Sequence, residues 1–257
     1  MVQVTKMERI NITYIDDELK DAIWVGEGSV ATCYKAEYDR VYKLFKNIKI
    51  AKEMTKKTLF NGDADSFCSL TNDSVHTPDR LVVDDSGIIL GYSYHYVEGT
   101  AIAHISEDIT VLELFKNYKK LIDDIQKISF DGFRITDMNR ENILFDSNNY
   151  FHIIDLDNGC FMQNASKANQ IYFNKSNCSI VFKTIINNIF GKDVTDELRF
   201  DDYLLNELLM QIYCGDIKIM RSLIDYISSS LCEETNPKIA ALRKYAKLKT
   251  KSKKNVF

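Results

Sequence analysis

Short apolar runs separated by turn residues dominate the first hundred residues. AIWVGEGSV (22–30) is one run that ends at glycines, and TCYKAEYDRVYKLF (32–45) predicts two strands joined at residues 38–40. LVVDDSGIILGYSYHYV (81–97) predicts a hairpin with its turn at residues 84–87. The chain therefore begins with a strand-rich region, which we expect to form an antiparallel sheet.

Helical periodicity appears once inside this region and then takes over after residue 105. In 46–60 the apolar residues recur at helical spacing, which predicts one helix among the strands. The segment 109–128 carries its apolar residues on one helical face and predicts a single long helix. Further apolar-periodic segments predict helices near 178–190, 202–213, 216–231 and 236–248.

These patterns predict an α+β protein of two lobes without a long linker. We expect residues 1–97 to form the strand-rich lobe and residues 98–248 the mainly helical lobe. Residues 249–257 belong to the basic end of the chain, and we expect them to form a disordered tail.

Composition narrows the function classes. The chain has 257 residues, of which 45% are hydrophobic and 27% charged, with a net charge of −4. That balance gives no reason to expect nucleic-acid binding. No apolar run is long enough to span a membrane and the start lacks a signal peptide, so we expect a cytoplasmic protein. The six cysteines form no C-x-x-C pair, and reduced thiols are expected instead of zinc ligands or disulfides.

Unusual charge stands in front of an apolar strand at ITDMNRENILFD (135–146), and FHIID (151–155) follows it. A hairpin turning at residues 146–149 would bring Asp155 back beside Asn142, with Asp137 close by. Carboxylate and amide oxygens in that arrangement suit Mg²⁺, and Asp137 would be free to accept a proton from a hydroxyl. Taken one at a time, each residue is better explained as satisfying a turn or ending a strand.

Two upstream features add to this pattern. In GEGSVA (26–31), Gly26 and Gly28 leave backbone amides bare for phosphate oxygens, and Ser29 lies at the same turn. Lys43 alternates with Tyr42 and Leu44 and should point to the opposite face of its strand. Glu53, the only acidic residue of the 46–60 helix, is the best available carboxylate to hold that lysine.

In order and spacing, these pieces resemble the protein-kinase-like superfamily, from about residue 23 to residue 158. GEGSVA resembles the glycine-rich loop, ITDMNREN the H-R-D-L-x-x-x-N catalytic loop, and IDLDN the D-F-G motif. The resemblance implies a two-lobed kinase-like fold that binds ATP and Mg²⁺.

The same resemblance implies roles for individual residues. Asp137 would be the base or orienting residue, and Asn142 and Asp155 the Mg²⁺ ligands, with Asp157 as a further carboxylate. Lys43 would clamp phosphate with Glu53 as its partner. The resemblance also implies that the nucleotide contacts the glycine-rich loop, the rear of the pocket and the backbone of the hinge. The residues are Gly26, Gly28 and Ser29 in the loop, Tyr94 at the rear, and His95 and Val97 at the hinge.

The departures from the family pattern concern regulation and substrate. Ile135 and Thr136 replace the usual His and Arg, and Asn139 replaces a lysine for which Arg140 could substitute. There is no A-P-E motif, and only about twenty residues are expected between Asp155 and the next helix. The peptide-docking platform is therefore reduced, which brings the chain closer to aminoglycoside and choline kinase-like phosphotransferases.

The leading hypothesis is an ATP- and Mg²⁺-dependent phosphotransferase that acts on a hydroxyl of a protein, at Ser or Thr, or of a small molecule. The first alternative is a pseudokinase that binds nucleotide or a partner without turnover. The second is a kinase-fold nucleotidyltransferase. Retention of Asp137 together with Asn142 and Asp155 favours turnover.

Overall fold

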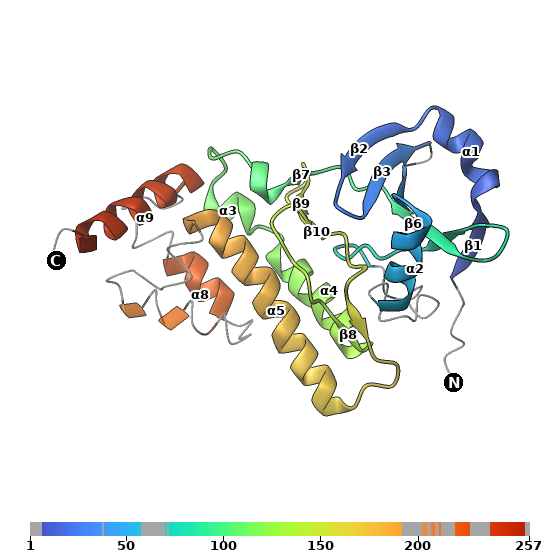
Figure 1. The fold of residues 1–257 in the computed structure, drawn as a ribbon. Helices are drawn as coiled ribbons and strands as arrows, with labels where there is room; N and C mark the ends of the chain where they lie inside the picture. Colours follow the sequence, from blue (N-terminus) through green and yellow to red (C-terminus); the bar gives the residue numbers. More distant parts are fainter. Residues whose placement is uncertain are drawn as a thin grey trace.

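The structure is a computed structural model that describes residues 7–37, 39–57, 70, 72–191, 203–204, 207–208, 211, 219–226 and 237–254. A strand-rich part, blue to cyan, lies beside a mainly helical part, green to red (Figure 1). The predicted α+β class is confirmed. Most of the helix predicted near 202–213 lies outside the described residues.

A six-stranded sheet forms the N-terminal part, in the order β1-β5-β6-β4-β3-β2. The predicted hairpins are confirmed: β3 pairs with β4, and β5 pairs with β6 through the turn at 84–87. The strands are β1 (Glu8–Asn11), β2 (Ile23–Glu27), β3 (Ala31–Ala36), β4 (Arg40–Phe45), β5 (Arg80–Val83) and β6 (Ile89–His95).

The N-terminal sheet differs from the purely antiparallel sheet with one helix that the sequence predicted. β1 pairs in parallel with β5, and a second helix, α1 (Ile12–Lys20), follows β1 directly. Both elements are short, and the spacing of Ile12, Ile15 and Leu19 on one face of α1 is a helical signal that the sequence analysis did not use. Asn11 caps α1 by accepting a hydrogen bond from the backbone N–H of Thr13.

Strand β4 separates two cores by its alternation. Tyr42 packs with Ile15 of α1 on one face, whereas Val41 and Phe45 belong to the main core on the other. Lys43 shares the second face, as predicted from its spacing. The helix predicted in 46–60 is α2 (Ile48–Lys57), which buries Ala51 and Met54 against the same core.

The C-terminal part combines two small sheets with helices. β7 (Thr100–Ala101), β9 (Ile143–Phe145) and β10 (Phe151–Ile153) form one sheet, and β8 (Phe133–Arg134) pairs with β11 (Cys160–Phe161) in the other. The helical elements are η3 (Ile102–His104), α3 (Val111–Leu114), α4 (Tyr118–Phe130), α5 (Lys167–Phe190), α8 (Ile219–Tyr226) and α9 (Ile239–Lys254).

Three helix predictions need correction. The single helix predicted over 109–128 is interrupted between α3 and α4, where the amide of Asn117, a weak helix former, donates to the carbonyl of Asn148. α5 begins at Lys167 instead of near 178, because Ser166 caps a polar first half that lacks apolar periodicity. α9 continues through Lys254, so the expected tail is helical up to that residue.

The segment 72–77 ties the two parts together. Val75 forms a parallel β-bridge with Ile153, the last residue of β10. The backbone N–H of Ser74 donates to the side chain of Asp124 in α4. His76 contacts His152 of β10 at 3.0 Å between ring nitrogens. A loop that leads into β5 is therefore built into the C-terminal part, which fixes the position of the sheet over the helices.

The structure also bears on the expectations about membrane-spanning segments and cysteines. Within the described ranges, no helix has the length and apolar character needed to cross a membrane. Cys33, Cys160 and Cys178 are free thiols, and the other three cysteines lie outside the described residues.

A substitution of Gly91 tests the packing of β6 against β4. A Cβ at this position would lie 2.3 Å from the carbonyl oxygen of Lys43, so Gly91→Ala must shift backbone. We expect a loss of about 1–3 kcal/mol in unfolding free energy, measured by thermal and denaturant unfolding. Gly26→Ala is the matched control, because its Cβ would meet nothing within 4 Å. Equal stability of the two variants would contradict this packing.

Candidate functional site

A cleft of about 710 Å³ lies between the N-terminal sheet and the segments around β9 and β10. Its walls combine the β2–β3 turn with the charged loop that precedes β9. All the residues predicted for the site line it except Glu53 and His95. The lining set is Gly26, Gly28, Ser29, Lys43, Tyr94, Val97, Asp137, Asn142, Asp155 and Asp157.

Lys43 is the centre of this cleft. Its ammonium group makes a close ion pair with the Oδ1 atom of Asp155 and lies 3.3 Å from the Oδ2 atom of Asp157. Burial alone would lower the pKa of Lys43, but the carboxylates of Asp157 and Asp155 outweigh it and raise the pKa. Lys43 is therefore a fixed positive charge at neutral pH.

Asp157 carries the most unusual environment among these groups. Its side chain is 1% exposed, and its Oδ1 atom has no hydrogen-bond partner. Burial raises the pKa of Asp157, Lys43 opposes that shift, and the neighbouring Asp155 adds to it. A buried carboxylate oxygen without a partner is costly to the fold, and it is the kind of atom that a cation would satisfy.

The β9–β10 hairpin brings Asp155 beside Asn142, as the sequence predicted. The backbone N–H of Ile154 donates to the carbonyl of Asn142 at 3.0 Å. Asp155 then takes a left-handed backbone conformation with φ of 59°, which is uncommon for a residue with a side chain. That conformation turns the chain directly after β10 and leaves Asp155 against Lys43 of the sheet.

Asp137 is exposed in the cleft, and the loop that carries it is held from behind. The buried side chain of Asn177, from α5, accepts a hydrogen bond from the backbone N–H of Ile135 at 2.7 Å. It also donates to the carbonyl of Phe133. Thr136 donates to the carbonyl of Asn158. The residues that replace the usual His and Arg thus fix the loop by other contacts.

The two glycines of the β2–β3 turn leave open space over the cleft. Cβ atoms would meet nothing within 4 Å at Gly26, and only the carbonyl of Ala31 at 3.9 Å at Gly28. Neither residue has a positive φ. Backbone conformation and packing therefore do not require glycine here. The N–H group of Gly28 donates to the carbonyl of Ala31 at 2.9 Å, so this amide is not bare as the sequence predicted. The unfilled space above the turn still suits an approaching phosphate group.

The rear of the cleft contains an aromatic layer. Tyr94 lines it and is 9% exposed, and Tyr92, which the sequence analysis missed, lies beneath Lys43. The Lys43 ammonium lies 5.6 Å from the centre of the Tyr92 ring. Burial raises the pKa of Tyr92 well above its ordinary value, and the carboxylates of Asp157 and Asp155 add to the shift.

Two predicted residues are not brought into the cleft. Glu53, the expected partner of Lys43, is exposed on α2, because the phase of that helix turns Ala51 and Met54 to the core. Asp155 and Asp157 contact Lys43 instead. His95 is absent from the described lining of the cleft, and its exposed side chain lies 3.8 Å from Asp79. The prediction for this residue concerned its backbone, which the position of the side chain does not test.

Apolar side chains that the sequence analysis did not single out complete the walls. Val25, Cys33 and Val41 come from the sheet, and Leu144 and Ile154 from the C-terminal part. The alternation of the strands could have identified Val41, which is two residues before Lys43 on the same face. Burial raises the pKa of the Cys33 thiol to about 11, so this thiol is protonated at neutral pH.

The donor set fits a magnesium ion that shares its coordination with phosphates. Across the described part of the chain, no cluster of three or more His, Cys, Asp or Glu side chains could hold a metal by itself. Mg²⁺ is usually held by one or two carboxylates together with substrate phosphates and waters. Asp155, Asp157 and the amide of Asn142 offer that partial set of oxygen ligands.

Comparison with solved structures shows which known proteins have a similar architecture. The pseudokinase DRIK1 (drought responsive inactive kinase 1), solved bound to ENMD-2076, matches with a TM-score of 0.54 and 10% identity, covering 96% of this chain and 98% of its own. The apo GRMZM2G135359 pseudokinase matches with a TM-score of 0.53 and 9% identity, over 98% and 96% of the two chains.

The chain therefore has a protein-kinase-like fold, in agreement with the resemblance seen in its sequence. No protein-family model and no curated protein matches it. At these identities the likeness concerns the fold alone, so the function depends on the residues of the cleft.

Replacement of Asp157 tests the cost of the buried carboxylate. We expect Asp157→Asn to raise the melting temperature of the protein without ligand, by about 2 °C or more near pH 8. The folded-state pKa of Asp157 lies above its unfolded value, so ionisation lowers stability as pH rises through that folded pKa. The advantage of the variant should therefore disappear towards about pH 4. Thermal unfolding of both proteins between about pH 4 and pH 8 measures this difference in melting temperature.

Asp123→Asn is the control for that series, since Asp123 is an exposed carboxylate on α4. It should leave the melting temperature unchanged at each pH. A less stable Asp157→Asn variant near pH 8 would show that the carboxylate stabilises the ligand-free fold, against our expectation.

Proposed function

We propose that this protein is an ATP- and Mg²⁺-dependent phosphotransferase that moves the γ-phosphate to a hydroxyl group. One observation carries the proposal: Lys43 is paired with Asp155 and Asp157 inside a cleft that also holds Asp137 and Asn142. A buried lysine held by two carboxylates, beside an exposed carboxylate, matches the requirements of phosphoryl transfer.

The residues of the N-terminal sheet would bind the nucleotide. Lys43 supplies a fixed positive charge for phosphate oxygens, and the space above Gly26 and Gly28 is open to them. The backbone near Val97 would meet the adenine, with Tyr94 closing the rear. With domain limits of 1–97 and 98–248, this half of the site would lie within the N-terminal lobe.

The residues of the C-terminal part would hold the metal and the acceptor. Asn142 and Asp155, with Asp157 behind them, would bind Mg²⁺. When bound, ATP–Mg²⁺ supplies the transferable phosphoryl group and neutralises its charge. Asp137 would accept the proton of the attacking hydroxyl, and its loop is held by Asn177 and Thr136, which limits its motion.

A pseudokinase is the second candidate. Both solved structures compared above are named as pseudokinases, and Ile135 and Thr136 depart from the kinase pattern in this chain. Retention of Asp137 favours turnover, because a protein that only binds nucleotide does not need a proton acceptor. The acceptor hydroxyl could belong to Ser or Thr of a protein or to a small molecule.

Nucleotide binding gives the first test of this proposal. We expect ATP with Mg²⁺ to raise the melting temperature, because the ligand binds only the folded state; at 100 times its Kd the gain is about 2.7 kcal/mol. Lys43→Met should remove most of that gain, whereas Lys175→Gln, an exposed charge on α5, should retain it. A melting temperature that is unchanged by millimolar nucleotide would exclude both the phosphotransferase and a nucleotide-binding pseudokinase.

Asp137→Ala separates the two candidates. In a phosphotransferase it should leave ATP affinity near wild type and slow transfer by about 10²- to 10⁴-fold. Asp155→Asn should weaken metal-dependent nucleotide binding as well, because it removes a charged ligand. Nucleotide affinity, ADP release and autophosphorylation, with mass spectrometry of the product, measure both effects.

The outcomes of that experiment are distinct. Turnover that survives in Asp137→Ala would remove our assignment of the base. AMP found on the product, in place of phosphate, would retain the fold and make the protein a nucleotidyltransferase. ATP binding that is unaffected by Asp137→Ala, with no turnover by wild type, favours the pseudokinase.

A further inference from the structure

The segment 72–77 is a second link between the two parts of the molecule, in addition to the ion cluster in the cleft. It runs beside β10 (Figure 1), where the backbone N–H of Ile153 donates to the carbonyl of Ser74 at 2.7 Å. The backbone N–H of His76 donates in turn to the carbonyl of Ile153 at 3.0 Å. Because β10 ends two residues before Asp155, this link lies next to the candidate site.

Two imidazole rings meet across this link. The Nε2 atom of His76 lies 3.0 Å from the Nδ1 atom of His152 in β10, with the ring centres 5.2 Å apart. The carbonyl oxygen of Asp73 lies 3.1 Å from the same Nδ1 atom. The other ring nitrogen of His152, Nε2, lies 3.1 Å from the Oδ2 atom of Asp146. His152 is therefore held at both of its nitrogens.

The hydrogen bonds limit the number of protons that the two rings can carry. Burial would raise the pKa of Asp146, but hydrogen bonds from Tyr150 and His152 outweigh it and lower the pKa. The carboxylate is therefore ionised and can only accept, so the Nε2 atom of His152 carries a proton that it donates. Between the facing nitrogens of His152 and His76 there is room for one proton, which one ring donates and the other accepts. A second proton there would put two N–H groups against each other.

The surrounding charges leave a second proton without compensation. Asp73 already pairs with Lys120 of α4, and Asp124 pairs with Lys127 of the same helix. Burial and the neighbouring His152 lower the pKa of His76 to about 4. The charged or titratable groups around the two rings are Asp73 from the segment itself, Lys120, Asp124 and Lys127 from α4, Asp146 from the β9–β10 turn and His95 from β6.

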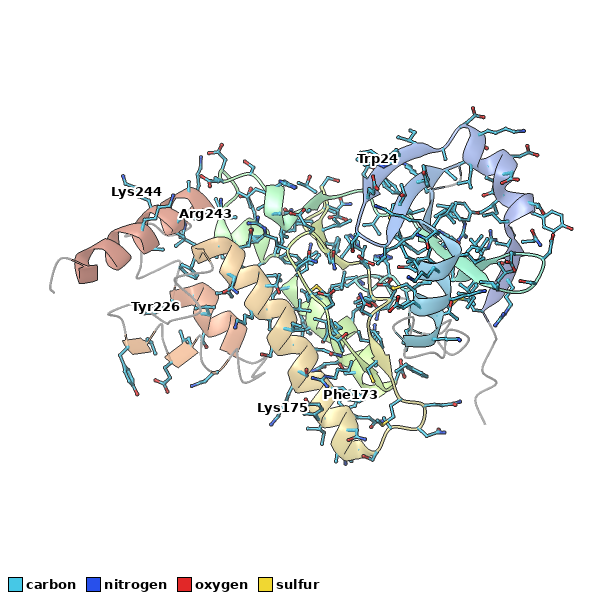
Figure 2. All side chains as sticks on the ribbon, viewed as in Figure 1. Trp24, Phe173, Lys175, Tyr226, Arg243 and Lys244 are labelled. Atoms are coloured by element: carbon cyan, nitrogen blue, oxygen red, sulfur yellow. The ribbon has the colours of Figure 1, made fainter. Side chains whose placement is uncertain are left out.

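Movement of the segment would reach both walls of the cleft. Side chains crowd the space between the N-terminal sheet, marked by Trp24, and α5, marked by Phe173 (Figure 2). On the sheet side, Asp79 follows the segment and pairs with Arg40 of β4 at 2.7 Å. On the other side, Asp155 holds a left-handed backbone conformation, which persists only where the surrounding structure enforces it.

We propose that the contact between His76 and His152 is an acid-sensitive latch between the two parts of the molecule. With one proton between the facing nitrogens the latch is closed, and the segment 72–77 stays against β10. A second proton opens the latch, which frees Asp155 from its place against Lys43 and weakens nucleotide binding. The effect on nucleotide binding rests on the proposed function, whereas the opening itself does not.

Stability across pH tests the titration of the latch. The folded-state pKa of His76 lies below its unfolded value, so the unfolded state binds more protons as pH falls below about 6.5. Compared with His76→Gln, the folding equilibrium constant of wild type should fall by about 10²-fold between about pH 7 and about pH 4. Denaturant unfolding at each pH measures it. His104→Gln, which replaces an exposed histidine of η3, should retain the wild-type dependence.

Hydrogen exchange and nucleotide binding test the opening. Near pH 4 the amides of His76 and Ile153 should exchange faster in wild type than in His76→Gln, relative to amides of α5 that report global unfolding. Between about pH 7 and about pH 4, the affinity for ATP–Mg²⁺ should fall about tenfold more in wild type than in the variant. Calorimetry measures the affinities.

The outcomes separate this inference from the proposed function. The NMR signals of the wild-type imidazoles need no variant, and a His76 that titrates near its ordinary pKa of about 6.5 would overturn the latch. Titration near pH 4 without faster exchange at Ile153 would also overturn it, because the proton would then be accepted without opening. Opening with unchanged nucleotide affinity would overturn the link to the cleft. Failure of ATP–Mg²⁺ to bind at neutral pH, with opening observed, would count against the proposed function alone.

Discussion

The ion cluster of Lys43, Asp155 and Asp157 is the contact on which the candidate site depends. It joins the middle of β4 to the segment that follows β10, and so connects the two parts across the cleft. Its geometry is costly, since Asp157 is buried with one unpartnered oxygen and Asp155 has a positive φ. Such costs persist where the surrounding structure enforces them, and they concentrate at functional sites.

The loop before β9 gives the site its second constraint. Asn177 of α5 holds its start, and the side chain of Asn139 holds its middle. The cleft that holds Asp137 lies along this loop, and residues 138–140 of the same loop line a second cavity of about 690 Å³. A loop held in this way keeps Asp137 in one position within the cleft, and positioning is the main contribution that a protein makes to phosphoryl transfer.

The departures from the kinase pattern are consistent with this picture. Ile135 replaces a polar residue and is 1% exposed, so it adds to the core below the loop. Thr136 bonds to the carbonyl of Asn158 and thereby ties the loop to the segment after Asp157. These contacts hold the loop without an arginine that would need a phosphorylated partner. The short chain between Asp157 and α5 leaves little room for a peptide-docking platform.

The sequence by itself determined the features that depend on local periodicity. Alternation along β4 put Lys43 on the face of the main core. The hairpin after Asn142 brought Asp155 back beside Asn142. Only the tertiary structure decided the partner of Lys43, the parallel pairing of β1, the break before α4 and the second cavity. These depend on the phase of α2 and on contacts between segments far apart in the chain, which no local pattern encodes.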